Sequence, residues 1–425
     1  MGLFGGIGRF HRDARLFLFT TVVFGGALSL YWIDFNLYLA SLGHSPATIG
    51  IVATAGSTAG ALAAFPASAL SDRVGRRAVM VGGMVLAILA VIGLLLVTDV
   101  VAIMAFAALW AAGQQSLMVV QAPFLAEHSD AEHRNELFAA QSAIFTMTNV
   151  LAAVLGGVVA TAIAGMAGFD RGGPETYRVI LVIMAVLLVA ALATIGLLTD
   201  DRPRSRRVSD RHSVDEEEPR TRTLMGITVT DRVRFVRLLL PGFLIATGAG
   251  QVIPFLNVFV QQKFGLDLAS LNALFAFTSL GTVAAMLAQP RLARRFGQIT
   301  SVVIVQAASI PFLVVLGFSP LLWSVILAMA VRNSLMNAGN PIFSAFAMEH
   351  VDPVERATLA AAMSVLWQVG WVIGGAWYAL LQATLGFDGG YTVNFLTVIT
   401  LYTIATALYW FWFRRVDRRR LAEPA

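Results

Sequence analysis

The stretch SDRVGRR, residues 71–77, separates two apolar runs at residues 46–70 and 78–98. Each run is long enough to cross a bilayer as a helix, which takes about 20 apolar residues. Gly75 permits a tight turn between the runs, while the aspartate and the three arginines keep that turn in water. We therefore expect two membrane helices joined by a short charged loop.

Apolar runs of this length continue on both sides of the pair. They are too long for membrane strands and show no period of two, so we expect helices. Six runs precede a polar interval, near residues 16–40, 46–70, 78–98, 101–126, 137–166 and 177–198. Six follow it, near residues 235–260, 271–290, 299–318, 321–348, 357–385 and 391–413. The sequence predicts an all-α membrane protein with twelve transmembrane helices in two six-helix halves.

The polar interval marks the division of the chain. Residues 200–222 carry seven acidic residues, seven arginines and two prolines, a composition typical of a solvated linker. The predicted divisions are an N-terminal half at 1–199, a cytoplasmic linker at 200–234, a C-terminal half at 235–413 and a cytoplasmic tail at 414–425.

The composition excludes several classes of protein. Of the 425 residues 57% are hydrophobic and 13% charged, about half the charged share of a soluble chain. Cysteine is absent, and all six histidines lie in polar stretches, so we expect no disulfide and no metal site. No nucleophile–base cluster or phosphate loop stands out, so we expect neither a catalytic site nor a cofactor.

The arginines predict the orientation in the membrane. With the N-terminus inside, 26 of the 30 lysines and arginines fall on the cytoplasmic side and three outside. We therefore expect a multi-pass protein of the inner (cytoplasmic) membrane with both termini cytoplasmic. The basic pI near 9.9 then reflects topology and anionic lipid rather than a nucleic-acid partner.

The two halves repeat each other in sequence. The string Ser-Leu-Met at 116–118 recurs at 334–336, and Gly-Gly at 156–157 recurs at 374–375. Asn36 matches Asn257, and Gly43 matches Gly265. Because six helices separate the copies, both halves have the same orientation, which indicates a parallel repeat.

Six plus six helices with SDRVGRR between the second and third resemble the major facilitator superfamily of secondary transporters. A shortened copy, RRFG at 294–297, fills the equivalent loop of the second half. The resemblance implies that charged residues of these loops latch the cytoplasmic side shut; the alternative is that they only hold the loops inside. The implied gating residues are Asp72, Arg73, Gly75, Arg76, Arg77, Glu127, Arg134, Glu349 and Arg356.

Two ionisable residues lie well inside predicted spans, Asp34 and Arg332. Such residues are costly in a membrane, so each is a candidate for function. Asp34 is the candidate proton carrier; the alternatives are binding of a cationic substrate or a hydrated acid near the outer mouth. Arg332 cannot lose its proton and is a candidate clamp for an anion or a structural counter-charge.

Polar amides accompany these charges. Asn333, Asn337 and Asn340 share one helical face. Such amides either bind substrate or join helices. The predicted substrate-binding residues are Asn36, Gln114, Gln251, Asn257, Arg332, Asn333, Asn337, Asn340 and Gln368. Tryptophans that could form aromatic walls are Trp32, Trp110, Trp367 and Trp371.

Taken with the resemblance, these residues predict a transporter that works by alternating access, with a small organic molecule, protons and the lipid bilayer as partners and a monomer as the working unit. We expect export of a drug-like molecule or metabolite in exchange for protons. Two departures from the superfamily's exporters weigh against export: Gln114 stands where many have arginine, and Gly156-Gly157 lacks their proline. The alternatives are an organic-anion carrier or facilitator that uses Arg332, and a receptor or scaffold that does not transport.

Overall fold

The computed structural model describes residues 10–128, 134–170, 172–199, 231–278, 295–352 and 355–422. Within these ranges the chain is helical apart from short turns. Nine described helices are long and apolar enough to cross a membrane. One of them, α12, contains two predicted spans. This all-helical architecture confirms the predicted fold class.

The described residues of the first half form six helices whose bounds follow the apolar runs. They are α1 (Arg12–Ser41), α2 (Pro46–Val74), α3 (Arg76–Leu96), α4 (Val100–Glu127), α5 (Arg134–Ala167) and α6 (Pro174–Gly196). Side chains cap three of them. The His11 ring accepts from the Asp13 amide before α1, the Ser45 hydroxyl accepts from the Thr48 amide before α2, and Asp99 accepts from Val101 and Ala102 before α4.

The second half is less regular. Its elements are α7 (Arg232–Val252), the 3-10 turn η2 (Ile253–Phe255), α8 (Leu256–Phe264), a helix at Leu268–Thr278, α10 (Gln298–Phe318), α11 (Leu322–Glu349) and α12 (Arg356–Ala422). The predicted single span at 235–260 is broken at η2, where Pro254 lacks an amide hydrogen for the helix ladder. Gly386, at φ 68°, divides α12 into two helices.

Glycines with positive φ support the repeat. Gly75 and Gly297 precede α3 and α10 at φ 98° and 87°. Gly43 and Gly265 follow α1 and α8 at φ 85° and 63°. Only glycine adopts such angles readily, so equivalent turns of the two halves have equivalent backbones.

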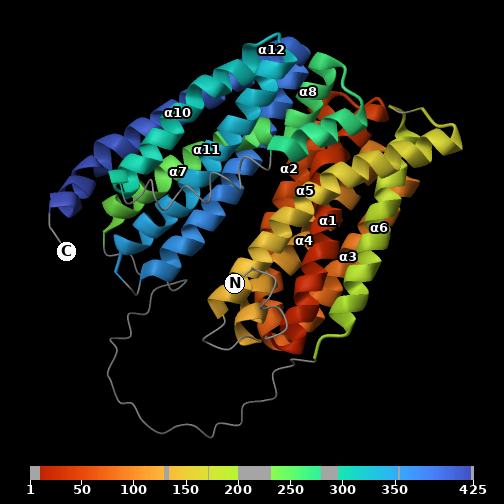
Figure 1. Ribbon diagram of the computed structural model, residues 1–425, viewed down its shortest axis with the longest axis horizontal. Coiled ribbons are helices and arrows are strands. Elements are labelled where there is room, and N and C mark those ends of the chain that lie inside the picture. The colour runs from red at the N-terminus through yellow and green to blue at the C-terminus, as the bar shows by residue number, and fades with distance from the viewer. Residues whose placement is uncertain are drawn as a thin grey trace, which may run out of the picture.

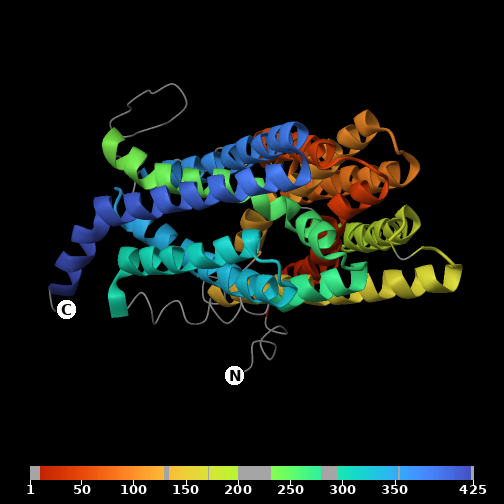
Figure 2. The same cartoon turned by 90° about the horizontal axis from the view of Figure 1, so that it is seen from above.

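The halves converge at one end and separate toward the other (Figure 1). We call the convergent end, where α1 ends and α8 lies, the closed end. The opposite end, where α1 and α7 begin, is the arginine-rich end. Figure 2 shows the same two groups of helices side by side.

Packing of α2 on the first part of α12 joins the halves at the closed end. A Cβ atom on Gly50 would lie 2.8 Å from the ring of Tyr378 and 3.0 Å from the Cα of Ala379. About one helical turn along the same contact the glycine belongs to α12: a Cβ on Gly375 would lie 2.7 Å from the Thr54 hydroxyl of α2. Glycine at both positions therefore permits the close approach of the two helices.

Candidate functional site

A cavity of about 140 Å³ lies between the halves. Helices α1, α2 and α4 line it from the first half, and α7, η2 and α12 from the second. The lining residues are Tyr31, Trp32, Phe35, Asn36, Val52, Ala53, Thr54, Gly56, Ser57, Gly60, Trp110, Ala111, Gln114, Gln115, Gly250, Pro254, Phe255, Gln368, Trp371 and Gly375. Because both halves contribute, relative movement of the halves changes the cavity.

Aromatic rings form much of the cavity wall. Tyr31 stacks on Trp110 and on Phe35, with ring centroids 4.5 Å apart in each pair. Trp32 meets Trp371 edge to face across the two halves, at 5.7 Å. The predicted aromatic walls are thus present for three of the four tryptophans named from the sequence, while Trp367 lines a different pocket of the second half.

The polar side chains of the lining are neutral. Gln114 and Gln115 come from α4, Gln368 from α12, and hydroxyls from α2. No charged side chain lines the cavity within the described part of the chain. The indole N–H groups of Trp110 and Trp371 are buried and have no acceptor among the described residues.

Two asparagines, Asn36 and Asn257, join the halves beside the cavity through hydrogen bonds that we call the clasp. The Asn36 side chain donates to the carbonyl of Pro254 at 2.5 Å, and the Asn257 side chain donates to the carbonyl of Ile33, also at 2.5 Å. Two more hydrogen bonds between described residues of the two halves lie at the closed end, from Asn272 to Asp34 and from Gln261 to the Tyr177 hydroxyl.

Asp34 lies behind the cavity wall rather than in it. Its side chain is 3% exposed, and Oδ1 accepts from the Asn272 amide at 3.0 Å. Its Oδ2 has no hydrogen-bond partner among the described residues. Asn272 also packs closely against α5: a Cβ atom on Gly157 would lie only 2.9 Å from the Asn272 side chain. The only acid predicted to carry a proton therefore sits in a buried contact between the halves.

Arg332 forms a separate cluster within the second half. Its guanidinium donates to the Tyr402 hydroxyl at 2.9 Å and to the Asn333 side-chain oxygen at 3.1 Å. Asn337 donates to the carbonyl of Asn333. The arginine is 4% exposed, so this cluster is packed between α11 and α12 and does not open into the cavity.

The structure thus divides the predicted binding residues. Asn36, Gln114 and Gln368 line the cavity. Gln251 is buried beside it, with its amide bonded to the carbonyl of Thr247, and Asn257 belongs to the clasp. Some predicted binding and gating side chains lie outside the described residues: Asp72, Arg134, Asn340 and Arg356.

At the arginine-rich end, the described gating residues contact their own half. Arg76 pairs with Glu127 at 3.2 Å, and at the equivalent positions of the second half Gln298 donates to Glu349, also at 3.2 Å. Arg77 donates to the carbonyl of Gly196 at the end of α6. Arg73 is exposed, and Gly75 forms the turn.

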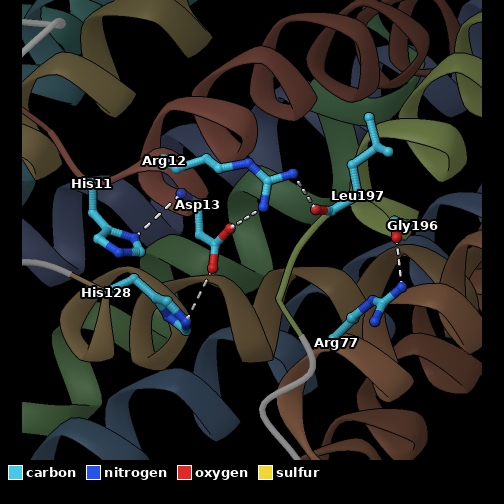
Figure 3. A network of polar contacts seen from close by, with 7 residues as sticks. All are labelled: His11, Arg12, Asp13, Arg77, His128, Gly196 and Leu197. Atoms are coloured by element: carbon cyan, nitrogen blue, oxygen red, sulfur yellow. Dashed lines mark hydrogen bonds and ion pairs between the residues drawn. The ribbon is translucent and has the colours of Figure 1, made fainter.

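Figure 3 shows a polar network here that sequence reasoning missed. Buried Asp13 lies 3.7 Å from the His128 imidazole and 4.0 Å from the Arg12 guanidinium. Arg12 also donates to the carbonyl of Leu197. These contacts tie α1, α4 and α6 together. Asp13 and His128 are far apart in the sequence and share no motif, so no sequence signal identifies the pair.

Other functional residues were also missed. Asn272, the partner of Asp34, is a single amide in an apolar run and gives no signal. The α2 wall of the cavity had a signal, because the small residues Thr54, Ser57 and Gly60 line it at helical spacing.

The fold matches solved transporters. A bacterial homologue of the human lysosomal transporter Spinster, in an inward-facing and occupied conformation, aligns with TM-score 0.73 and 14% identity over 94% of this chain and 96% of that one. The nucleoside transporter NupG gives TM-score 0.74, 13% identity and coverage of 94% and 99%. The human organic anion transporter MFSD10 gives TM-score 0.60 and 15% identity over 94% of this chain and 99% of that one.

Comparison by sequence identifies the family. No curated protein sequence matches the chain. The sequence profile of the Major Facilitator Superfamily matches residues 17–375, most of the chain. This match, the all-helical fold and a cavity between two repeated halves agree with one another, and the chain therefore belongs to the Major Facilitator Superfamily of membrane transporters.

Proposed function

We propose that this protein is a secondary transporter of the cytoplasmic membrane that exports a small organic molecule in exchange for protons. In this proposal a single chain suffices, and Asp34 carries the proton. The arginine-rich end faces the cytoplasm, as the excess of arginine in its loops favours. The protein binds and moves its substrate without catalysing a reaction.

The observation that carries this proposal is the distribution of contacts between the halves. The described hydrogen bonds that join them lie at the closed end, beside a cavity lined from both sides. Such an arrangement supports an inward-facing state, in which the cavity is shut off from the outside. Rocking of the halves about the cavity would break the closed-end contacts and give the outward-facing state.

Asp34 couples this movement to a proton through the cost of burying charge. An ionised carboxylate loses its hydration when the closed end forms, and the one hydrogen bond that it accepts from a described residue, Asn272, compensates for only part of that loss. A neutral carboxyl group enters the same contact at lower cost. Asp34 therefore takes up a proton while the outside is open, and the protonated form permits closure.

In the outward-facing state the gating residues would hold the arginine-rich end shut. There Asp72, Arg73, Arg76, Arg77 and Gly75 of one loop would meet partners of the other half, with help from Glu127, Arg134, Glu349 and Arg356. In this structure Arg76 pairs with Glu127 of its own half at 3.2 Å.

The other functions have less support. An organic-anion carrier needs Arg332 at the substrate, but its guanidinium is buried against Tyr402, away from the cavity. The structural similarity to the human organic anion transporter therefore does not identify a residue of this cavity that would bind an anion. A receptor or scaffold that does not transport gains little from paired gating loops and from a cavity shared by two halves.

Transport in liposomes tests the proposal. Purified protein is reconstituted with a pH-sensitive dye inside and an imposed pH gradient, and cationic, neutral and anionic compounds are added in turn. We expect compound-dependent proton flux that is lost in Asp34→Asn and kept in Asp170→Asn, whose carboxylate is exposed between α5 and α6. Flux of a labelled compound that ignores the gradient and survives Asp34→Asn contradicts proton coupling.

A further inference from the structure

The cavity between the halves selects against charge. Its described lining combines the rings of tyrosine, tryptophan and phenylalanine with the amides of Asn36, Gln114, Gln115 and Gln368. An ion that entered this cavity would lose its hydration without gaining a counter-charge from the described lining. The free-energy cost of that desolvation is high. A neutral molecule loses less water and can regain its hydrogen bonds from the amides.

The two intramembrane charges do not alter this conclusion, because neither faces the cavity. Asp34 is buried against Asn272, and Arg332 is bonded to Tyr402 and Asn333. Both side chains are less than 5% exposed. An ionic substrate would have to displace these buried contacts before it could pair with either residue.

The walls favour a flat ring with acceptors at its edge. Rings stack on aromatic side chains in offset or edge-on arrangements, which the tyrosine and tryptophans at the cavity offer from both halves. The amides of Gln114, Gln115 and Gln368 also line the cavity and are only partly buried. A ring with acceptors at its edge can accept hydrogen bonds from these amides, which adds affinity.

The volume limits the size of the ring system. The cavity of about 140 Å³ is close to the ~150 Å³ of a protein cavity that accommodates one benzene molecule. It therefore holds one small aromatic ring in this conformation, with the rest of a larger substrate extending toward the arginine-rich end.

We infer that the transported molecule enters this cavity with an uncharged, planar heteroaromatic ring that carries hydrogen-bond acceptors at its edge. This inference rests on the proposed function, because it assigns the substrate of the same site. It differs from that proposal in concerning equilibrium binding, which needs neither a membrane nor a gradient.

Three probes that share one pyridine ring test the inference. Nicotinamide is neutral near pH 7, nicotinate is an anion and 3-(aminomethyl)pyridine is a cation. Binding to the purified full-length protein in detergent is measured by calorimetry and by quenching of tryptophan fluorescence. We expect nicotinamide to bind about tenfold or more tightly than either charged probe, since ions lose more solvation. Tighter binding of a charged probe, or no binding of any probe, overturns the inference.

Two variants locate the binding. Gln368→Leu removes an amide at nearly constant shape, and Trp371→Phe replaces the indole of the cavity wall by a smaller ring. Each should weaken nicotinamide binding about fivefold, the effect of one hydrogen bond or of one aromatic contact. Trp323→Phe is the matched control, because Trp323 is 65% exposed on α11 and does not line the cavity. Unchanged affinity in both cavity variants, with melting temperatures preserved, contradicts this site.

The binding and transport results separate the two proposals. Preferential nicotinamide binding without any gradient-linked flux in liposomes supports the neutral-ring site and contradicts proton-coupled export. Proton-linked flux of nicotinate or of the amine, with no nicotinamide binding, contradicts the neutral-ring site while transport stands.

Discussion

Asn36 and Asn257 hold the two halves together through reciprocal hydrogen bonds. Each side chain donates to the backbone carbonyl three residues before the other: Asn36 to Pro254 and Asn257 to Ile33. The two residues are equivalent positions of the repeat, so the clasp has the approximate two-fold symmetry of the halves. A bond pattern of this kind can form only where equivalent helices of the two halves face each other.

The clasp predicts the effect of removing it. Asn36→Ala with Asn257→Ala should open the closed end, shifting the equilibrium about fivefold or more, because each hydrogen bond contributes about 1 kcal/mol. Since the chain has no cysteine, spin labels can be placed at Ile51→Cys and Leu380→Cys, both exposed on α2 and α12. We call the distance between these labels the closed-end distance and expect it to lengthen.

A control separates the clasp from a general loss of amides. The Asn149 side chain donates to the carbonyl of Phe145 in its own helix, so Asn149→Ala should leave the closed-end distance as in the parent. An unchanged distance in the double variant would show that the clasp does not hold the halves.

Gly50 makes a second, steric prediction. Gly50→Ala places a methyl group 2.8 Å from the Tyr378 ring and 3.0 Å from the Ala379 Cα, so α2 must move away from α12. We expect a longer closed-end distance and a lower transport rate. Gly82→Ala on α3 is the control, since nothing lies within 4 Å of its Cβ position. Equal behaviour of the two variants would contradict close packing at Gly50.

The Arg332 cluster should contribute to stability rather than to binding. Tyr402→Phe removes the acceptor of a buried guanidinium, which should destabilise the protein by about 1–3 kcal/mol. Thermal melting in detergent measures this effect, with Tyr409→Phe, another buried tyrosine of α12, as the control. Nicotinamide binding should be unchanged in Tyr402→Phe. Lost binding with normal melting would instead place the cluster at the substrate.

Asp72 tests the proposed latch at the arginine-rich end. Asp72→Asn removes a charge that would pair across the halves in the outward-facing state, so we expect slower transport at a normal amount of protein in the membrane. Asp170→Asn serves as the control for a neutralised loop carboxylate. Normal transport by Asp72→Asn would mean that the loop charges only orient the protein.

The helices could be predicted from sequence because membrane spans are local. Runs such as 46–70 and 299–318 correspond to α2 (Pro46–Val74) and α10 (Gln298–Phe318), with Ser45 capping the former. The break at η2 was missed, although Pro254 within an apolar run is a signal for it. Local composition therefore predicts the spans but not how each is distorted.

The cavity was only partly predictable, because helix rotation and the docking of the halves decide which amides face it. Asn36, Gln114 and Gln368 line the cavity, whereas Arg332 has the same kind of sequence signal but turns toward Tyr402. The contact between Asp34 and Asn272 joins residues of different halves. No pattern within either half identifies such a partner.

The closed-end distance as a function of pH tests the coupling most directly. Burying an ionised Asp34 is costly, so acid should favour the closed end and alkali the open end. Asn272, the hydrogen-bond partner of this carboxylate among the described residues, is an amide and does not titrate. In Asp34→Asn we expect the closed end to persist at every pH. A pH response that survives in Asp34→Asn, or a wild-type distance that does not change with pH, would contradict proton coupling through Asp34.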